Sequence, residues 1–204
     1  MSKPKLVQMA GFPGAGKTRI ARYLSRKLGA PRISTDDLRE MLYGKRYPDD
    51  IGKELGLPNR YGTTRTEEDY MCGTAKRLQI WYLLEGIGSI VDFSSPNNKG
   101  RAWVFDTKSP TGTEVEVDKY LIVVQVDENV LRTQREHPES VDRWKRVWEE
   151  PDNKGYQTIV LQNNTKWGYR RALRTAFRAL TDEENPKIWR EKLKAEQAAA
   201  GESL

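Results

Sequence analysis

The sequence contains very few of the residues that build disulfides and most protein zinc sites. Among its 204 residues are one cysteine and one histidine. Cys72 alone cannot form an intrachain disulfide or a cysteine metal site, and His137 alone cannot form a multi-histidine zinc site. There is no apolar run of the ~20 residues that a membrane-spanning helix needs. Met1–Pro4 leads directly into a short apolar segment without a signal-peptide core, so we expect a cytoplasmic protein with no membrane partner.

The charge balance is moderately basic. Lys and Arg number 35 against 29 Asp and Glu, which gives a net charge of +6 and a pI near 9.3. Such an excess favours polyanionic partners, although phosphate attraction requires the cations to be clustered and not merely numerous. The length predicts one domain, here residues 1–181, followed by a charged helical tail over 182–204.

Short apolar segments alternate with amphipathic ones along the domain. Strands are expected at 5–10, 31–34, 89–92, 120–126 and 158–161. Helical spacing follows the first strand and ends at Gly29, and Thr35 or Asp36 is expected to cap the next helix. A further helix begins near Thr66, and others are expected at 129–136, at 140–150 and after the last strand. This alternation predicts an α/β fold with a mostly parallel sheet flanked by helices.

A glycine-rich segment lies between the first strand and its helix. Residues 11–18 match G-x-x-x-x-G-K-[ST] without a mismatch, and both neighbours are of the kind that this phosphate loop requires. The glycines let backbone N–H groups converge on phosphate oxygens, the lysine meets the β- and γ-phosphates, and the threonine hydroxyl ligates Mg²⁺. The motif therefore predicts a nucleoside triphosphate, taken as ATP with Mg²⁺, held by Gly11, Pro13, Gly14, Ala15, Gly16, Lys17 and Thr18.

An acidic residue at the end of a neighbouring strand commonly faces the Mg²⁺ of such a site. Asp92 follows one apolar strand and Asp127 follows another. We favour Asp92 as the metal-facing acid, since a strand-end acid such as Asp127 is often only a turn residue.

Beyond the phosphate loop, the chain resembles the polynucleotide kinase branch of the P-loop kinases. The resemblance rests on Ile33–Arg39, on Val91–Asn97 followed by Arg101, and on Arg132 and Arg135 after a later strand. The wider group contains zeta-toxin-like and small-molecule kinases. Most of residues 5–165 are covered, and only the phosphate loop is specific by itself. The fold that this implies is a P-loop kinase fold with a lid.

The resemblance implies roles for these residues. Asp36 would be the general base that accepts the proton of an attacking hydroxyl, and Arg39 would hold a phosphate of the acceptor. Arg132 and Arg135 would close over the triphosphate as catalytic lid arginines, together with Lys17. Asp92 and Arg101 would contact the acceptor. As alternatives, Asp36 is only a helix cap and Arg39 only a surface ion pair.

Several segments are less clearly defined. The lid is expected at about 132–152, and an acceptor-side loop at about 44–65 combines aromatic and basic residues that the family pattern does not match. Within 101–117, the resemblance implies a helix at 99–107, whereas the residues also permit a β-hairpin that pairs 102–105 with 114–117.

The expected activity is transfer of the γ-phosphate to an alcohol group. A nucleic-acid acceptor is favoured, either a 5′-hydroxyl end or a hydroxymethyl-pyrimidine in DNA, with a small-molecule kinase as the main alternative. A non-catalytic nucleotide-dependent switch is the third possibility. The donor base and the subunit number stay open. A stripe of arginines between Arg170 and Arg178 is interpreted as a solvated helix face, with a nucleic-acid track as the alternative.

Overall fold

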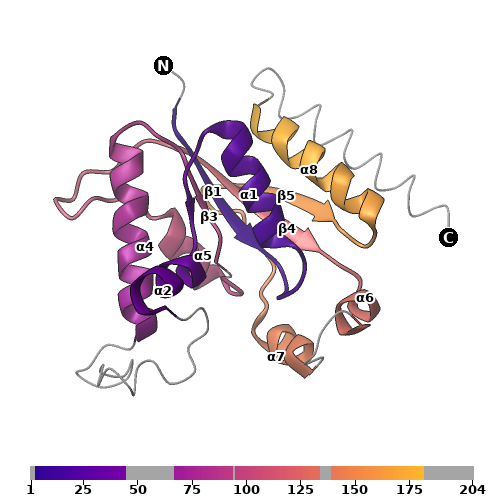
Figure 1. The fold of residues 1–204 in the computed structure, drawn as a ribbon. Helices are drawn as coiled ribbons and strands as arrows, with labels where there is room; N and C mark the ends of the chain where they lie inside the picture. The colour runs from indigo at the N-terminus through magenta and orange to yellow at the C-terminus, as the bar shows by residue number, and fades with distance from the viewer. Residues whose placement is uncertain (1–2, 45–66, 94, 134–138, 182–204) are drawn as a thin grey trace.

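The fold is taken from a computed structural model that describes residues 3–44, 67–93, 95–133 and 139–181 (Figure 1). Its strands are β1 (Lys5–Ala10), β2 (Arg32–Ile33), β3 (Ser89–Val91), β4 (Asp118–Gln125) and β5 (Gln157–Gln162). Its helices are α1 (Lys17–Leu28), α2 (Thr35–Tyr43), α4 (Glu67–Leu84), α5 (Asn98–Phe105), α6 (Glu128–Thr133), α7 (Glu139–Val147) and α8 (Lys166–Thr181). The tail 182–204 and most of the expected acceptor-side loop lie outside the described residues.

The strands form one five-stranded sheet in the order β2-β3-β1-β4-β5. Every neighbouring pair is parallel, with Val7 opposite Ile90 on one side and opposite Tyr120 on the other. All carboxyl ends therefore meet at one edge of the sheet, and loops that follow the strands gather there. The expected α/β fold with a parallel sheet is confirmed.

Helices cover both faces of the sheet. On one face, α1 and α8 pack against Met9, Ile122 and Val124; on the other, α4 and α5 pack against Leu121 and Val123. The side chains of β4 thus alternate between two apolar layers, which is why that strand is almost continuously hydrophobic. In Figure 1, α1 and α8 lie together on one side of the sheet.

Helix α2 begins where β2 ends. The Ser34 hydroxyl accepts a bond from the Asp37 N–H, so Ser34 is the N-cap and the expected cap at Thr35 or Asp36 is wrong. Both Asp36 and Asp37 then lie in the first turn, where their charges stabilise the positive end of the helix dipole. The inner face of α2 packs Leu38 against Met71 of α4.

The segment after β3 is helical, as the resemblance implied. Helix α5 is capped by the Asn97 side chain, which accepts a bond from the Gly100 N–H. The alternative hairpin is wrong, because residues 102–105 are helical; all that remains of it is an isolated antiparallel bridge between Lys108 and Glu114. Among the described residues, no helix combines the length and apolar character needed to cross a bilayer.

Candidate active site

The phosphate loop connects β1 to α1 at the carboxyl edge of the sheet. Gly11, Gly14 and Gly16 have φ angles of 129°, 86° and 93°, which side-chain-bearing residues rarely adopt. A Cβ at Gly11 would also lie 2.3 Å from the Val124 carbonyl oxygen. Glycine is therefore required at position 11 by both the backbone angle and the close approach of β4.

Lys17, the first residue of α1, is nearly buried and lies across the loop. Its Nζ donates to the carbonyl oxygens of Gly11 at 2.9 Å and of Phe12 at 2.8 Å. The ammonium group is thus held inside the curve of the loop, at the N-terminal end of a helix, where anions bind favourably.

A contact from the far end of the chain supports the loop. Asn163, directly after β5, donates from Nδ2 to the Ala15 carbonyl oxygen at 2.7 Å. The same amide would clash with a Cβ at Gly16, at 2.7 Å. Sequence reasoning did not identify Asn163, because its place beside the loop depends on the strand order.

Asp92 follows β3 and is almost completely buried, with a side chain 2% exposed. Burial raises the pKa of this carboxyl, against the opposing effects of the Arg32 guanidinium, a hydrogen bond from Thr18 and the charge of Lys17. The structure therefore brings Asp92 together with Thr18 and Lys17, as the sequence predicted. Asp127 instead accepts a bond from the Asn129 N–H at the start of α6, which is a turn contact.

Arg32 on β2 connects Asp92 to the acidic turn of α2. Its guanidinium pairs with Asp92 through Nη1 and with Asp37 through Nη2, and its side chain is 9% exposed. A planar guanidinium suits this double role because its N–H groups fork toward two carboxylates. Arg32 was not assigned to the site in the sequence analysis. The only signal for it was its place in a short strand, four positions before Asp36.

Asp36 and Arg39 form an ion pair on α2, with Nη1 and Oδ1 2.9 Å apart. The Asp36 side chain is 45% exposed, whereas the Arg39 side chain is 10% exposed. Asp36 is therefore an accessible carboxylate at the carboxyl edge of the sheet, one residue from the Arg32–Asp37 contact. Its predicted role as general base stays a prediction.

Arg101 lies in the interior and not on an open surface. Its guanidinium donates to the carbonyl oxygens of Ser95 and Pro96 and to the Asn98 side chain, and it lies over the Trp148 ring. Trp148 in turn stacks on Phe12 of the phosphate loop, with ring centroids 5.6 Å apart. These bonds give Arg101 a supporting position behind the loop, and its direct contact with an acceptor stays a prediction.

Arg132 is bonded within the expected lid. Its guanidinium pairs with Glu128 on its own helix and with Asp142 on α7. These carboxylates raise the pKa of Arg132, and their own pKa values are lowered. The pairs join α6 to α7, whereas Arg135 lies outside the described residues. The lid role of both arginines stays a prediction.

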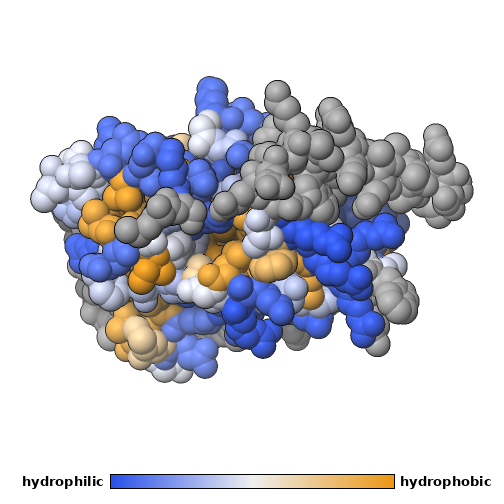
Figure 2. All heavy atoms as spheres, turned by 90° about the horizontal axis from the view of Figure 1, so that it is seen from above, coloured by the Kyte–Doolittle hydropathy of each residue, from blue (hydrophilic) through white to orange (hydrophobic). Residues whose placement is uncertain are grey.

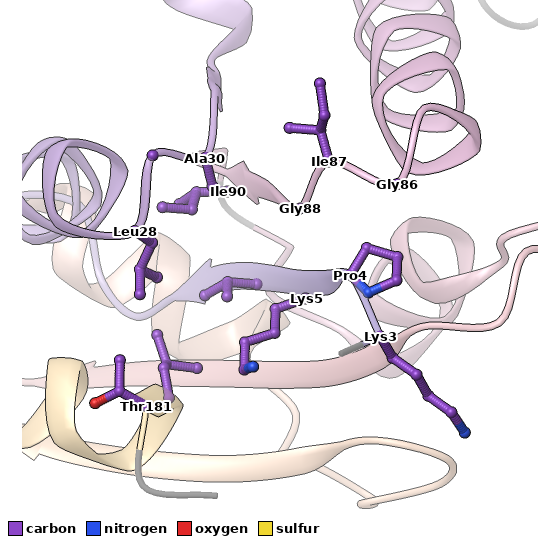
Figure 3. Close-up of a pocket in the computed structure, with 13 residues that line it drawn as sticks. Lys3, Pro4, Lys5, Leu28, Ala30, Gly86, Ile87, Gly88, Ile90 and Thr181 are labelled. Carbon is purple, nitrogen blue, oxygen red and sulfur yellow. The ribbon is translucent and has the colours of Figure 1, made fainter. Parts of the chain in front are cut away.

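A cavity of about 370 Å³ lies at the opposite edge of the sheet, near the start of β1 (Figure 3). Residues lining it include Lys5, Leu28, Ala30, Ile90 and Thr181. Because the phosphate loop follows the other end of β1, this cavity takes no part in the site described above.

The parallel sheet and the glycine-rich loop define a P-loop kinase fold. The chain belongs to the AAA domain family, whose profile matches residues 6–140. No curated protein matches the chain.

Several solved structures resemble it in fold. One described as a sugar kinase from Janibacter sp. HTCC2649 has a TM-score of 0.56 at 18% identity, covering 84% of this chain and 93% of that one. A putative kinase from Chloroflexus aurantiacus has a TM-score of 0.59 at 14% identity, covering 90% and 100%. A gluconokinase from Sinorhizobium meliloti has a TM-score of 0.52 at 16% identity, covering 91% and 100%.

Proposed function

We propose that the protein is an ATP-dependent phosphotransferase that moves the γ-phosphate to an alcohol group. The observation that carries this is the series of side-chain contacts from Thr18 through Asp92 and Arg32 to Asp37. This series joins the phosphate loop to the first turn of α2, where the Asp36 side chain is partly exposed. A phosphate-binding loop and an accessible carboxylate thus share one edge of the sheet, as phosphoryl transfer to a hydroxyl requires.

The loop residues fit a nucleoside triphosphate with Mg²⁺. The Thr18 hydroxyl lies close enough to the Asp92 carboxylate to lower its pKa, so the two oxygens are neighbours. Mg²⁺ commonly takes one or two protein oxygens and completes its shell with phosphates and water, which suits a site where the described residues form no larger acidic cluster. When bound there, the ion would neutralise charge on the phosphates.

Asp36 would perform the proton transfer. The acceptor oxygen forms a bond to the γ-phosphorus, the bond from that phosphorus to the β,γ-bridging oxygen breaks, and the hydroxyl proton passes to the Asp36 carboxylate. Arg39 keeps that carboxylate oriented through the ion pair. Lys17 would offset the charge that develops on the phosphates.

Nucleic acid is the acceptor that we favour. The chain is basic overall, and the arginine on α2 accompanies the proposed base, an arrangement that suits an acceptor bearing its own phosphate. Small-molecule acceptors are the second candidate, because the similar structures include proteins described as sugar, gluconate and shikimate kinases.

The test is transfer from γ-³²P-ATP to a panel of acceptors: 5′-hydroxyl DNA and RNA, DNA with internal hydroxymethyl-pyrimidines, nucleosides, and sugar acids. We expect label on nucleic acid, and none with Lys17→Ala. If only small molecules became labelled, the acceptor would be a small molecule and not nucleic acid. ATP binding without transfer to any acceptor would contradict the proposed activity and favour a nucleotide-dependent switch.

A further inference from the structure

The charge of the chain is distributed very unevenly over its helices. Helices α1 and α8 together hold ten of the 35 lysines and arginines and none of the 29 aspartates and glutamates. The rest of the chain therefore has 25 basic and 29 acidic residues and is net negative. The positive net charge of the protein comes from these two helices.

The fold brings the two helices together. Ile20 and Leu24 of α1 share one core cluster with Ala172 and Ala176 of α8, on the same face of the sheet. The Arg19 guanidinium also lies over the Tyr169 ring, 4.3 Å from its centroid. Their outward sides therefore form one surface, which we name the α1–α8 face.

The cations of the α1–α8 face are exposed. Its exposed basic residues are Arg19, Arg22, Arg26, Lys27, Arg170, Arg171, Arg174 and Arg178. Figure 2 shows strongly hydrophilic residues gathered on the side of the molecule where α8 lies. The arginine stripe of α8 was interpreted from sequence as a solvated face; beside α1 it becomes half of a larger cationic surface.

We propose that the α1–α8 face binds the sugar-phosphate backbone of a nucleic acid. Clustered arginines and lysines without intervening acids attract a polyanion strongly, and each neutralised phosphate releases counterions. Among the residues whose side chains the structure describes, none of the large exposed hydrophobic ones belongs to α1 or α8, so the described part of the face shows no apolar anchor of the kind that a membrane-surface helix uses.

The position of the face relates it to the phosphate loop. Arg19 comes directly after Thr18, so the face begins at the carboxyl edge of the sheet and extends along both helices away from it. A nucleic-acid strand bound along the α1–α8 face would reach the carboxyl edge of the sheet, where the proposed phosphate transfer occurs. The inference thus extends the proposed nucleic-acid acceptor, but binding at the face requires neither ATP nor Asp36.

The test compares two full-length variants with equal net charge. One removes four cations of the face, Arg22→Gln, Arg26→Gln, Arg174→Gln and Arg178→Gln. The matched control removes four exposed cations elsewhere, Arg77→Gln, Lys99→Gln, Lys108→Gln and Lys154→Gln. Binding of a fluorescent single-stranded DNA, without ATP, is measured by anisotropy across a salt series. All eight positions are exposed, and thermal unfolding checks that both variants fold.

We expect the face variant to bind DNA at least about tenfold more weakly at low salt, with the slope of log K against log salt reduced by about two to three. The control should stay near wild type. Equal weakening in both variants would show that only net charge matters and would overturn the inference. Binding to phosphatidylserine vesicles with none to DNA would overturn it in favour of a membrane.

The outcomes also separate this inference from the proposed function. DNA binding that depends on the face, with no phosphate transfer to nucleic acid, would refute the nucleic-acid acceptor and leave the face as a binding surface. If the protein transfers phosphate to nucleic acid but the face variant binds DNA as well as wild type, the role of the α1–α8 face is refuted and the nucleic-acid acceptor is retained.

Discussion

At the residue scale, the site depends on carboxylates with different surroundings. Asp92 is buried and bonded to Arg32 and Thr18, whereas Asp36 is accessible and paired with Arg39 alone among the contacts described. A buried, bonded carboxylate is suited to hold fixed positive groups, and an accessible one can meet a mobile substrate. The two acids therefore suit the two roles proposed for them.

Asp36→Asn tests the proposed base with almost no change in shape. The amide cannot accept the hydroxyl proton, so we expect transfer to fall by roughly 10²–10⁴-fold while ATP binding is retained. Initial transfer rates and calorimetric ATP binding measure the two effects. Glu40→Gln, on an exposed position of the same helix, is the matched control. A transfer rate near wild type in Asp36→Asn would reject this base.

Arg32→Met tests the connection between β2, β3 and α2. Removing the guanidinium leaves the buried Asp92 carboxylate without its main cationic partner, and breaking such a pair costs about 3–5 kcal/mol. Urea unfolding of Arg32→Met, Asp92→Asn and the double variant measures this. We expect Asp92→Asn to cost less in the Arg32→Met background than alone; equal costs would show that the two side chains are not coupled.

At the scale of elements, α4 and α5 are joined by a half-buried lysine. The Lys76 ammonium donates to the carbonyl oxygens of Trp103 and Val104, at 2.8 and 3.1 Å, and to that of Asp106. The first two carbonyls belong to the last turn of α5 and the third to its C-cap residue Asp106, and carbonyls at this end have no partner within the helix. Lys76 thus completes the C-terminal end of α5 from a neighbouring helix.

Burial lowers the pKa of Lys76 to about 8, from 10.5 in the unfolded chain. Between these values the unfolded chain binds more protons at this position than the folded one, so this residue makes the free energy of unfolding rise with pH. We expect the stability of the wild type relative to Lys76→Met to increase from pH 7 to pH 10, measured by denaturant unfolding. A difference that is constant with pH would contradict the shift.

Local patterns in the sequence predicted most elements and the phosphate loop. Helix α1 was predicted through to Gly29 because its buried positions repeat at helical spacing and glycine ends it in a left-handed conformation. The cap of α2 was misplaced by one or two residues because Ser34, Thr35 and Asp36 all suit that position. Choosing among them requires the backbone angles at the end of β2.

The contacts that complete the site depend on the order of the strands. Arg32 meets Asp92 because β2 lies beside β3, and Asn163 meets Ala15 because the exit of β5 approaches the phosphate loop. The sequence gives no direct measure of which strands are neighbours. The exposure of the α8 arginines agrees with the predicted solvated face, whereas their place beside the cations of α1 also depends on the strand order.

At the scale of the whole molecule, a ligand of the phosphate loop should stabilise the complete sheet. Both helical layers pack against the sheet through shared core clusters, so local binding is coupled to global unfolding. At ATP-Mg concentrations of 100 times Kd, we expect about 2.7 kcal/mol of added stability, seen as a higher unfolding temperature. Lys17→Ala should lose the increase and Arg22→Ala should keep it. An equal rise of the unfolding temperature in both variants would show that the nucleotide binds outside the phosphate loop.

The Asn163–Ala15 hydrogen bond has a consequence for protein synthesis. The loop that ends β1 emerges early from the ribosome, yet the amide that supports it lies 148 residues later. A nascent chain therefore lacks the finished loop until β5 has left the exit tunnel and paired with β4. We therefore expect nucleotide binding that depends on this support only after nearly the whole domain has been translated.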